Sequence, residues 1–257
     1  MQSSHFTMAL ASCFATLWGT SAGAVASAAE SRSGDFGLVA PGEVLMVGEV
    51  HGTKETPAAF VQLVDRMLTR ADVVSVSLEM PPNAGAAGCE RDSGSGAVGA
   101  FWTRKAQDGR SSQAMREMVC QLKARAAQGK VRLLYLETVP RNQDEMVRRV
   151  STEVASKTRP MVILIGNFHS RKAPNSFAER LRAQGVPVTS LTISSPDATT
   201  WNCNQDGCGA RPMQMNFCPE ETAGSYLLVK APAGGRWDGC MVLPRLTSSP
   251  PFKSGRS

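Results

Sequence analysis

The sequence predicts an α/β protein with a mostly parallel central sheet flanked by helices, followed by a Cys-rich, irregular C-terminal segment. Short apolar and β-branched runs alternate along the chain with stretches whose apolar residues recur at helical spacing. Two of the strand-like runs end in the same pattern, Gly-x-x-His. Apolar residues make up 42% of the chain and aromatic residues only 6%, which indicates one ordinary-sized domain with an aliphatic core.

The elements follow in order along the chain. Strands are expected at residues 44–48, 73–78, 131–136, 161–165 and 186–193, with short final strands at 226–229 and 240–243. Helices are expected around 60–68, 115–122, 146–154 and 177–185. Thr56-Pro57 is typical of an N-cap followed by proline at the first helical position. The segments 83–99 and 194–224 are rich in small and polar residues and predict loops.

The first 28 residues have the composition of a signal peptide. They contain no Asp, Glu, Lys or Arg, and they end in the small-x-small pattern Ala26-Ser27-Ala28. We therefore expect an exported protein, periplasmic or secreted, with a signal peptide at 1–28, a single α/β domain at 29–247 and a mobile tail at 248–257. A lipoprotein anchored through Cys13 is the alternative. No later apolar segment is long enough to span a bilayer.

Six cysteines follow the leader, and an even number in an exported chain predicts disulfides. We expect Cys89 to pair with Cys120, because both flank one insertion between strands. The remaining four, Cys203, Cys208, Cys218 and Cys240, are then expected to pair among themselves. A zinc site at Cys203, Cys208 and Cys218 is the alternative, although no histidine lies nearby in the sequence.

The charge pattern argues against nucleic acid as a partner. The formal net charge is +6, but the basic residues are scattered over the polar faces of the predicted helices. A small-molecule or peptide substrate is the expected partner.

Only two histidines remain after the leader, and both lie in a Gly-x-x-His motif, at 48–51 and 166–169. Glu79 and Glu137 each follow another predicted strand. Because parallel strands end at the same edge of a sheet, where α/β proteins bind ligands, we expect His51, His169 and Glu79 to form a catalytic site with Glu49 beside them.

Two kinds of chemistry suit these residues. His51 can remove a proton from water while a carboxylate orients its ring. Alternatively, Glu49, His51, Glu79 and His169 can ligate a divalent metal such as Zn, Mn, Fe or Co. We expect the dipole of the helix after His51 to keep that ring neutral. A serine nucleophile is not expected, because the single Gly-x-Ser-x-Gly, at 19–23, lies in the leader.

These motifs resemble the erythromycin-esterase, ChaN-like and Tiki/TraB-type superfamily. Residues 48–53 with Glu55 resemble its first motif, residues 166–169 its second, and Glu79 its acid after the second strand. Residues 141–146 resemble its Arg-Asp-x-x-Met helix start, with Asn in place of Asp and Met one position late. Residues 237–239 and 249–251 resemble its terminal elements. Glu49 places the chain closest to the ChaN-like and esterase-like branches.

The resemblance implies an α/β fold with a site at the strand edge. Members include macrolide esterases, metal-dependent peptidases and haem-binding proteins, so the fold alone does not assign an activity. This chain is much shorter than the macrolide esterases and lacks room for their helical region. The expected function is an exported hydrolase of an ester or amide.

A ChaN-like carrier of haem or metal is the alternative function. The two tyrosines that could ligate haem, Tyr135 and Tyr226, both lie within predicted strands. A third interpretation is a disulfide-stabilised envelope protein whose site has decayed.

Overall fold

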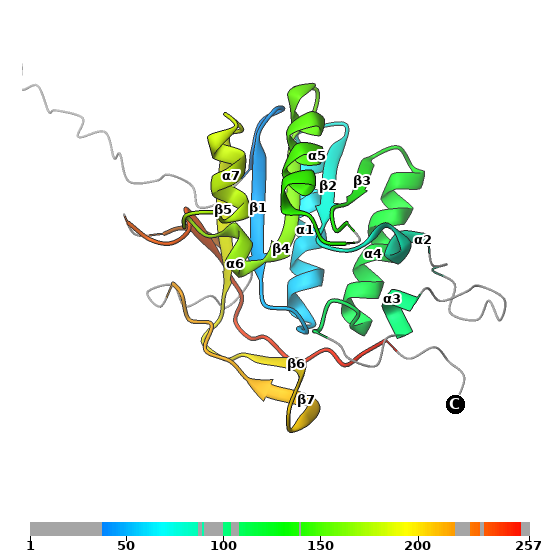
Figure 1. The fold of residues 1–257 in the computed structure, drawn as a ribbon, viewed down its shortest axis with the longest axis vertical. Coiled ribbons are helices and arrows are strands. Elements are labelled where there is room, and N and C mark those ends of the chain that lie inside the picture. The colour runs from blue at the N-terminus through cyan, green and yellow to red at the C-terminus, as the bar shows by residue number, and fades with distance from the viewer. Residues whose placement is uncertain are drawn as a thin grey trace, which may run out of the picture. The chain divides into compact units, whose positions relative to one another are not determined.

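A seven-stranded sheet forms the centre of the computed structural model, in the order β3-β2-β4-β1-β5-β9-β8 (Figure 1). The structure describes residues 38–86, 89, 100–103, 108–138, 140–218, 227–231 and 234–252. Residues 1–37 lie outside this set, and with them the expected signal peptide at 1–28 and Cys13. The strands are β1 (Val44–Glu49), β2 (Val74–Leu78), β3 (Val131–Tyr135), β4 (Met161–Gly166), β5 (Val188–Ser194), β8 (Leu227–Lys230) and β9 (Gly239–Val242). All neighbours pair in parallel except β8 and β9, which are antiparallel, so the predicted mostly parallel α/β fold is confirmed.

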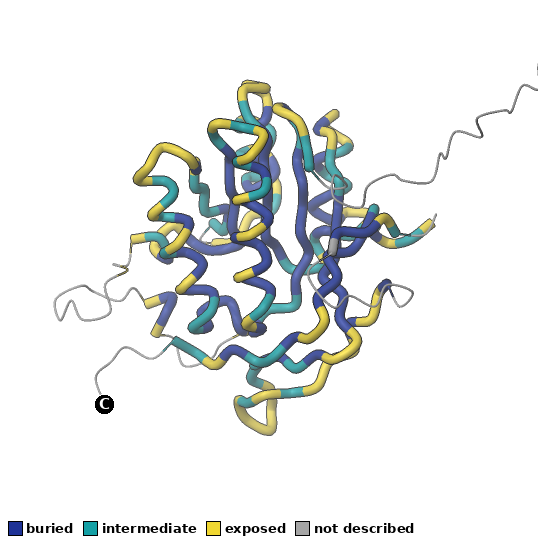
Figure 2. Tube along the Cα trace, turned by 180° about the vertical axis from the view of Figure 1, so that it is seen from behind, coloured by how far each residue is buried: buried dark blue, intermediate teal, exposed yellow. Residues whose placement is uncertain are grey.

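Helices cover both faces of the sheet. Helices α1 (Glu55–Leu68) and α4 (Gln113–Ala127) bury Phe60, Leu63 and Leu122 with one set of strand side chains. Helices α5 (Gln143–Ala155) and α7 (Phe177–Ala183) bury a second set on the opposite face. The strands are accordingly buried, while exposed residues gather on the outer turns of the helices (Figure 2). Three further helices are short: α2 (Pro82–Ala86), α3 (Ala100–Thr103) and α6 (Asn167–Ser170).

The chain leaves the two central strands toward opposite faces. Strands β1 and β4 are neighbours, yet β1 is followed by α1 on one face and β4 by α7 on the other. Such a switch point opens a crevice at the carboxyl edge of a parallel sheet, which is where α/β proteins bind ligands. His51 and His169 lie in the segments that directly follow these two strands.

Tertiary contacts change the expected start of the first helix. Helix α1 begins at Glu55, so Thr56 lies inside the first turn, and its hydroxyl is buried without a hydrogen-bond partner. The prediction of Thr56 as the N-cap was therefore wrong. Thr247 donates to the Glu55 carboxylate from its backbone N–H at 2.7 Å and from its hydroxyl at 2.6 Å, which holds Glu55 in the helix start.

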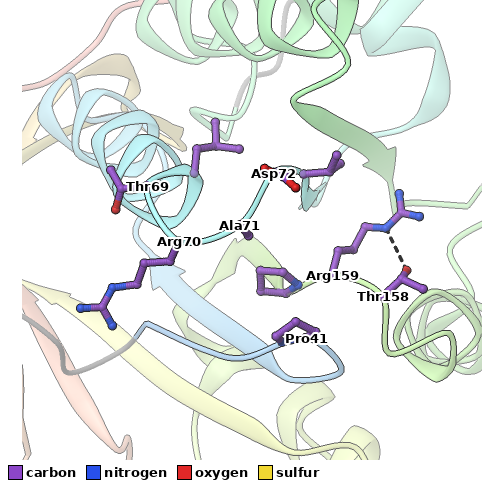
Figure 3. Close-up of a pocket in the computed structure, with 10 residues that line it drawn as sticks. Pro41, Thr69, Arg70, Ala71, Asp72, Thr158 and Arg159 are labelled. Carbon is purple, nitrogen blue, oxygen red and sulfur yellow. Dashed lines mark hydrogen bonds between the residues drawn. The ribbon is translucent and has the colours of Figure 1, made fainter.

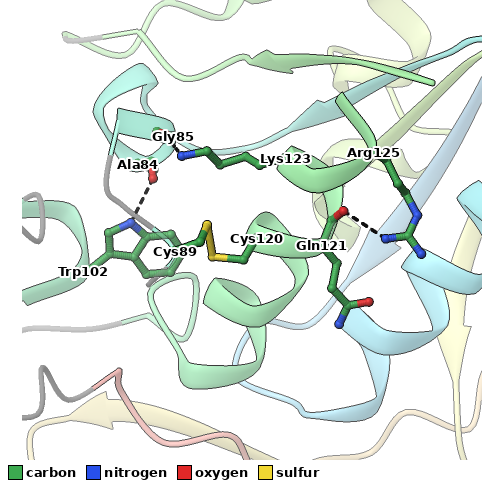
Figure 4. The surroundings of a disulfide bond; sticks show 8 residues. All are labelled: Ala84, Gly85, Cys89, Trp102, Cys120, Gln121, Lys123 and Arg125. Atoms are coloured by element: carbon green, nitrogen blue, oxygen red, sulfur yellow. Dashed lines mark hydrogen bonds between the residues drawn. A yellow bond between two sulfur atoms is a disulfide. The ribbon is translucent and has the colours of Figure 1, made fainter. Parts of the chain in front are cut away.

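Two segments predicted to be loops contain regular structure. Residues 82–86 form α2, where Ala84 accepts a hydrogen bond from the buried indole of Trp102 at 2.9 Å (Figure 4). Within 194–224, β6 (Thr199–Asn204) and β7 (Gly207–Pro212) form an antiparallel hairpin. Its strands are polar and rich in Asn and Gly, so they lack the apolar alternation by which sequence analysis detects strands.

The end of the chain packs more closely than the predicted mobile tail at 248–257. Ser249 is only 1% exposed, and its N–H donates to the carbonyl of Gly52 at 2.8 Å. Phe252 donates its N–H to Ser111 at 3.1 Å. The expectation was therefore wrong for residues 248–252, because the backbone groups of this segment bond to the loops at the sheet edge. Residues 253–257 lie outside the described residues.

The six cysteines from Cys89 onward are all paired, as Cys89–Cys120, Cys203–Cys208 and Cys218–Cys240. The predicted Cys89–Cys120 bridge is confirmed, and it joins α4 to the chain that follows α2 (Figure 4). The other four cysteines pair among themselves, also as predicted. The zinc alternative is excluded for Cys203, Cys208 and Cys218, because a disulfide sulfur has no thiolate to offer a metal.

None of the helices within the described ranges is both long and apolar enough to cross a membrane.

The bridges should differ in their contribution to stability. Cys89–Cys120 joins residues 31 positions apart and Cys203–Cys208 joins residues 5 apart. A longer closed loop restricts the unfolded chain more, so replacing both cysteines of the first pair by serine should lower the free energy of unfolding by ~3–4 kcal/mol, against ~2 kcal/mol for the second pair. Urea denaturation of the two double variants measures this. Equal losses would contradict the chain-entropy explanation.

Candidate functional site

The predicted site residues meet at the carboxyl edge of the sheet. Glu49 is the last residue of β1, and His51 follows in the loop to α1. Glu79 directly follows β2, and His169 lies in α6 just after β4. Because β2, β4 and β1 are adjacent strands, all four residues lie along one continuous stretch of this edge.

Glu49 orients the ring of His51. Its Oε1 lies 2.9 Å from His51 Nδ1, and the Glu49 side chain is 1% exposed against 20% for His51. Since an ionised carboxylate only accepts hydrogen bonds, Nδ1 carries the hydrogen and Nε2 is the basic nitrogen. The second oxygen of Glu49, Oε2, is buried with no hydrogen-bond partner. Its charge is therefore compensated mainly through His51.

Arg141 joins Glu79 to His169. Its Nη2 donates to Glu79 Oε1 and lies 2.9 Å from His169 Nε2. A guanidinium only donates, so His169 accepts at Nε2 and carries its hydrogen on Nδ1. Glu79 also accepts at Oε2 from the N–H of Gly166 at 2.6 Å. Both oxygens of Glu79 and one ring nitrogen of His169 are thus committed within the protein.

Gly166 marks the point where the three side chains converge. A Cβ placed on this glycine would lie 3.4 Å from Glu79 Oε2, 3.5 Å from His51 Nε2 and 3.7 Å from His169 Cδ2. These three are the nearest atoms to that position apart from the glycine's own chain neighbours, and all lie at ordinary van der Waals distance. The missing side chain therefore leaves space for a small reacting group beside the basic nitrogen of His51.

Arg110 supports the site from the loop before α4. It donates to Glu137 Oε2 at 3.1 Å, to Asp108 Oδ2 at 2.8 Å and to the backbone carbonyl of Glu79 at 3.4 Å. These carboxylates outweigh burial and raise the pKa of Arg110. Glu137 was noted in the sequence as an acid at a strand end, and its partner is this arginine rather than either histidine.

The two histidines have opposite electrostatic environments. Burial opposes protonation of His51, but the carboxylates of Glu49 and Glu79, with Glu49 the stronger, together outweigh it and raise the pKa of His51 above 6.5. Burial lowers the pKa of His169 below 6.5, and Arg141 reinforces that shift. Burial also disfavours the charged form of Glu79, yet His51 and the Gly166 N–H lower its pKa, so it is a carboxylate at neutral pH. Glu49 therefore acts against the helix dipole, which was expected to help keep His51 neutral.

The predicted metal ligands do not fit a metal in this arrangement. Across the described residues, no three His, Cys, Asp or Glu side chains are grouped so as to hold an ion. Arg141 supplies the hydrogen bond that occupies Glu79 Oε1 and His169 Nε2, and a guanidinium so close would repel a cation. With Glu79 and His169 committed to Arg141, only Glu49 and His51 of the four predicted ligands are left, and Glu49 Oε1 is already bonded to the His51 ring. The residues present therefore do not fit a metal ion.

Two concave surfaces lie at the opposite, amino edge of the sheet. One, of about 520 Å³, is lined by residues that precede β1, β2 and β4, including Pro41, Asp72 and Thr158 (Figure 3). The second, of about 450 Å³, adjoins the starts of β1 and β5. In Figure 3 the guanidinium groups of Arg70 and Arg159 extend away from the centre of the first hollow. Neither surface contains a predicted site residue.

Sequence reasoning missed Arg110 as a site residue and assigned Arg141 only to a family motif. Neither arginine lies in a strand or helix pattern, so periodicity gives no signal for them. Arg141 had a usable signal, because it follows a strand-ending acid and directly precedes the helix α5 with its Asn142 cap. Arg110 had none, since its role depends on the packing of its loop against Gly52.

Comparison with known proteins supports the fold only. No protein-family model matches the chain, and no curated protein matches it. The chain is similar to a crystal structure of a Bacillus cereus protein, with 9% sequence identity and a TM-score of 0.54. The match covers 84% of this chain and 91% of that one. At this identity the likeness shows a shared α/β fold and carries no activity across.

Histidine NMR should separate the two rings. A chain produced without residues 1–28 lacks His5 and holds only His51 and His169, so His51→Gln assigns both signals. His51 should titrate above 6.5 and His169 below it. Protonated His51 therefore stabilises the folded state fully below the unfolded pKa of 6.5, and this contribution disappears as the pH rises through the folded pKa. Glu49→Gln should lower the pKa of His51 and leave His169 unchanged; an unchanged His51 would disprove the assigned cause.

Two glycine substitutions should have contrasting effects. A Cβ on Gly48 would lie 2.0 Å from Ser170 Oγ in a buried contact, so Gly48→Ala should cost ~1–3 kcal/mol or more of stability. A Cβ on Gly166 meets only ordinary contacts, so Gly166→Ala should fold with nearly unchanged stability while filling the convergence point. Denaturant unfolding of both variants measures this. Comparable destabilisation by Gly166→Ala would show that the space beside it is not open.

Proposed function

We propose that this protein is a hydrolase in which His51 activates water for attack on an ester or amide carbonyl. The observation that carries the proposal is the carboxylate-backed imidazole whose free Nε2 faces the gap at Gly166. A buried Glu–His pair of this kind raises the basicity of the ring and fixes its tautomer. The resemblance of the two Gly-x-x-His motifs to an esterase-containing superfamily supports the same chemistry.

The proposed reaction needs one water and no other reactant. His51 Nε2 removes a proton from a water held beside Gly166 as the water oxygen bonds to the carbonyl carbon. The imidazolium is stabilised by Glu49 through Nδ1–H. When the tetrahedral intermediate collapses, the bond from carbon to the leaving oxygen or nitrogen breaks, and Nε2–H returns the proton to that atom. The products are a carboxylic acid and an alcohol or amine.

Arg141 is the proposed stabiliser of the intermediate. Its side chain is 41% exposed, and its contacts with Glu79 and His169 use Nη2 alone. The remaining N–H groups can therefore donate to the oxyanion that forms on the substrate. Glu79 holds the guanidinium in place, and His169 holds it from a second side.

The disulfides support the proposal that this hydrolase acts outside the cytoplasm. Three bridges are typical of exported proteins, because the cytosol keeps thiols reduced. The expected signal peptide at 1–28 agrees with that location, in the periplasm or in the medium.

The haem-carrier alternative finds less support at the tyrosine that the structure describes. The Tyr135 hydroxyl is buried without a hydrogen-bond partner, and burial raises its pKa to about 12. A ligand to haem iron must be accessible and lose its proton, and this phenol does neither. Tyr226 lies outside the described residues.

A substrate screen followed by substitution of His51 tests the proposal. Purified protein without a His-tag is assayed on a panel of esters and peptides, with and without added Zn, Mn or Co. On any substrate hydrolysed, His51→Ala should reduce the rate by roughly 10²–10⁴-fold, the usual contribution of a general base. His51→Gln should not restore it, because an amide has no useful basicity.

Two further variants make the screen specific. Glu49→Gln should shift the acidic limb of the pH–rate profile to lower pH, because His51 then loses the charge that raises its pKa. Arg159→Ala, at the opposite edge of the sheet, should leave the rate unchanged. Hydrolysis that survives His51→Ala would exclude His51 as the base. Stoichiometric haem binding without hydrolysis would favour the carrier function instead.

A further inference from the structure

Helix α6, which carries His169, is too short to hold its own position. It contains four residues, Asn167–Ser170, and a single helical turn is unstable in isolation. The direction of the His169 ring must therefore depend on what α6 packs against. Since His169 contacts Arg141, the same packing also bears on the arginine of the proposed site.

Ser170 connects α6 to the sheet below it. The serine is fully buried, and its hydroxyl donates to the carbonyl of Asn167 at 3.1 Å, which closes the turn. Gly48 of β1 lies directly against it, since a Cβ on Gly48 would come within 2.0 Å of Ser170 Oγ and 2.9 Å of Asn167 Cα. The turn thus rests on bare backbone of the strand that leads to His51.

Trp237 holds the same hydroxyl from the other side. The indole is 8% exposed, and its Nε1–H donates to Ser170 Oγ at 2.9 Å. An indole N–H only donates and a hydroxyl does both, so the chain of bonds runs in one direction, from Trp237 through Ser170 to Asn167. Phe217 packs on the indole, with ring centroids 5.2 Å apart.

The segment around Trp237 is itself firmly anchored. Asp238 accepts from the N–H of Ser190 at 2.7 Å, from its hydroxyl at 3.0 Å and from Arg182 at 2.7 Å. Its other oxygen pairs with Lys172 at 3.1 Å, and the Lys172 N–H donates to Arg236 at 2.6 Å. Residues 236–238 therefore bond both to Ser170 at the end of α6 and to Lys172, just after that helix.

We infer that Trp237 is a positioning residue that fixes the ring of His169 against Arg141 by holding Ser170. The inference rests on the proposed role of this site, but the contacts behind it concern only the placement of α6. Loss of the indole N–H leaves Ser170 with one bond fewer and lets α6 shift on Gly48. His169 Nε2 then loses its fixed donor, Arg141, while His51 keeps Glu49, which lies only two residues before it in the chain.

The test reads the tautomer of each histidine by ¹⁵N NMR at a pH where both rings are neutral. In the full exported chain, His169 should be the Nδ1–H tautomer, because Nε2 accepts from Arg141. In folded Trp237→Phe its two ring resonances should move toward each other as the tautomers mix, and those of His51 should stay in place. Trp201→Phe is the matched control, since the indole N–H of Trp201 has no hydrogen-bond partner, and it should leave His169 unchanged.

Ser170→Ala provides a second route to the same result. It removes the acceptor of the indole N–H, so its His169 spectrum should match that of Trp237→Phe, and the double variant should add nothing further. If Trp237→Phe does not fold, Ser170→Ala alone decides. A wild-type His169 spectrum in either folded variant would overturn the inference.

If the screen finds a substrate that the protein hydrolyses, kcat and KM of Trp237→Phe can be measured as well. The NMR test does not depend on this measurement. Trp237→Phe should lower kcat by about 10²-fold with little change in KM, as expected when a catalytic group is displaced by about 1 Å. Absence of any hydrolysis in the wild type would defeat the proposed function and leave the tautomer test intact. Altered tautomers with an unchanged kcat would defeat the link between Trp237 and the reaction.

Discussion

The parallel pairing of β1 with β4 is the constraint on which the site depends. In its register Gly48 pairs with Ile165 and Glu49 with Gly166, so the two Gly-x-x-His turns leave the sheet at almost the same level. Both strands are buried on both faces, and a slip of one residue would exchange the side chains of their two faces. Glu79 is fixed to the same pair of strands, because its backbone N–H donates to the carbonyl of Leu164 in β4 at 3.1 Å. The three functional side chains are therefore placed by the most buried part of the sheet.

Much of the fold and about half of the candidate site could be predicted from the sequence, because both depend on strands with a clear apolar pattern. The parts that were missed lack such a pattern. The central strands are continuous apolar runs, so periodicity finds them and their ends, including Glu49, Glu79 and both histidines. The β6–β7 hairpin escapes this method because its backbone is held by Cys203–Cys208 and by the bond from Trp201 N–H to Gly52. Arg110 escapes for a related reason, since packing of its loop and not its local sequence brings it to Glu79.

The protonation of His51 shows how magnitude decides between two correct principles. A helix N-terminus disfavours a nearby cation by about 0.3–1 kcal/mol. A carboxylate a few ångströms away is worth about 4 kcal/mol at an effective dielectric constant near 20. Glu49 lies 2.9 Å from the ring and is almost fully buried, so it dominates. The sequence contains both features, and only their distances from the ring reveal which of the two has the larger effect on the pKa of His51.

The two Gly-x-x-His motifs share a pattern but differ in their surroundings, because the partners of their histidines come from different distances along the chain. Glu49 and His51 are two residues apart, so their contact forms wherever β1 forms. His169 depends on Arg141, 28 residues away, and Arg141 on Glu79, 62 residues away, while Glu79 is held by Gly166, 87 residues away. Contacts between distant segments require the whole sheet to be closed, so they are the first to loosen when packing is disturbed. The Glu49–His51 pair is therefore the robust half of the candidate site, and the Arg141–His169 pair is the half that we infer Trp237 to hold.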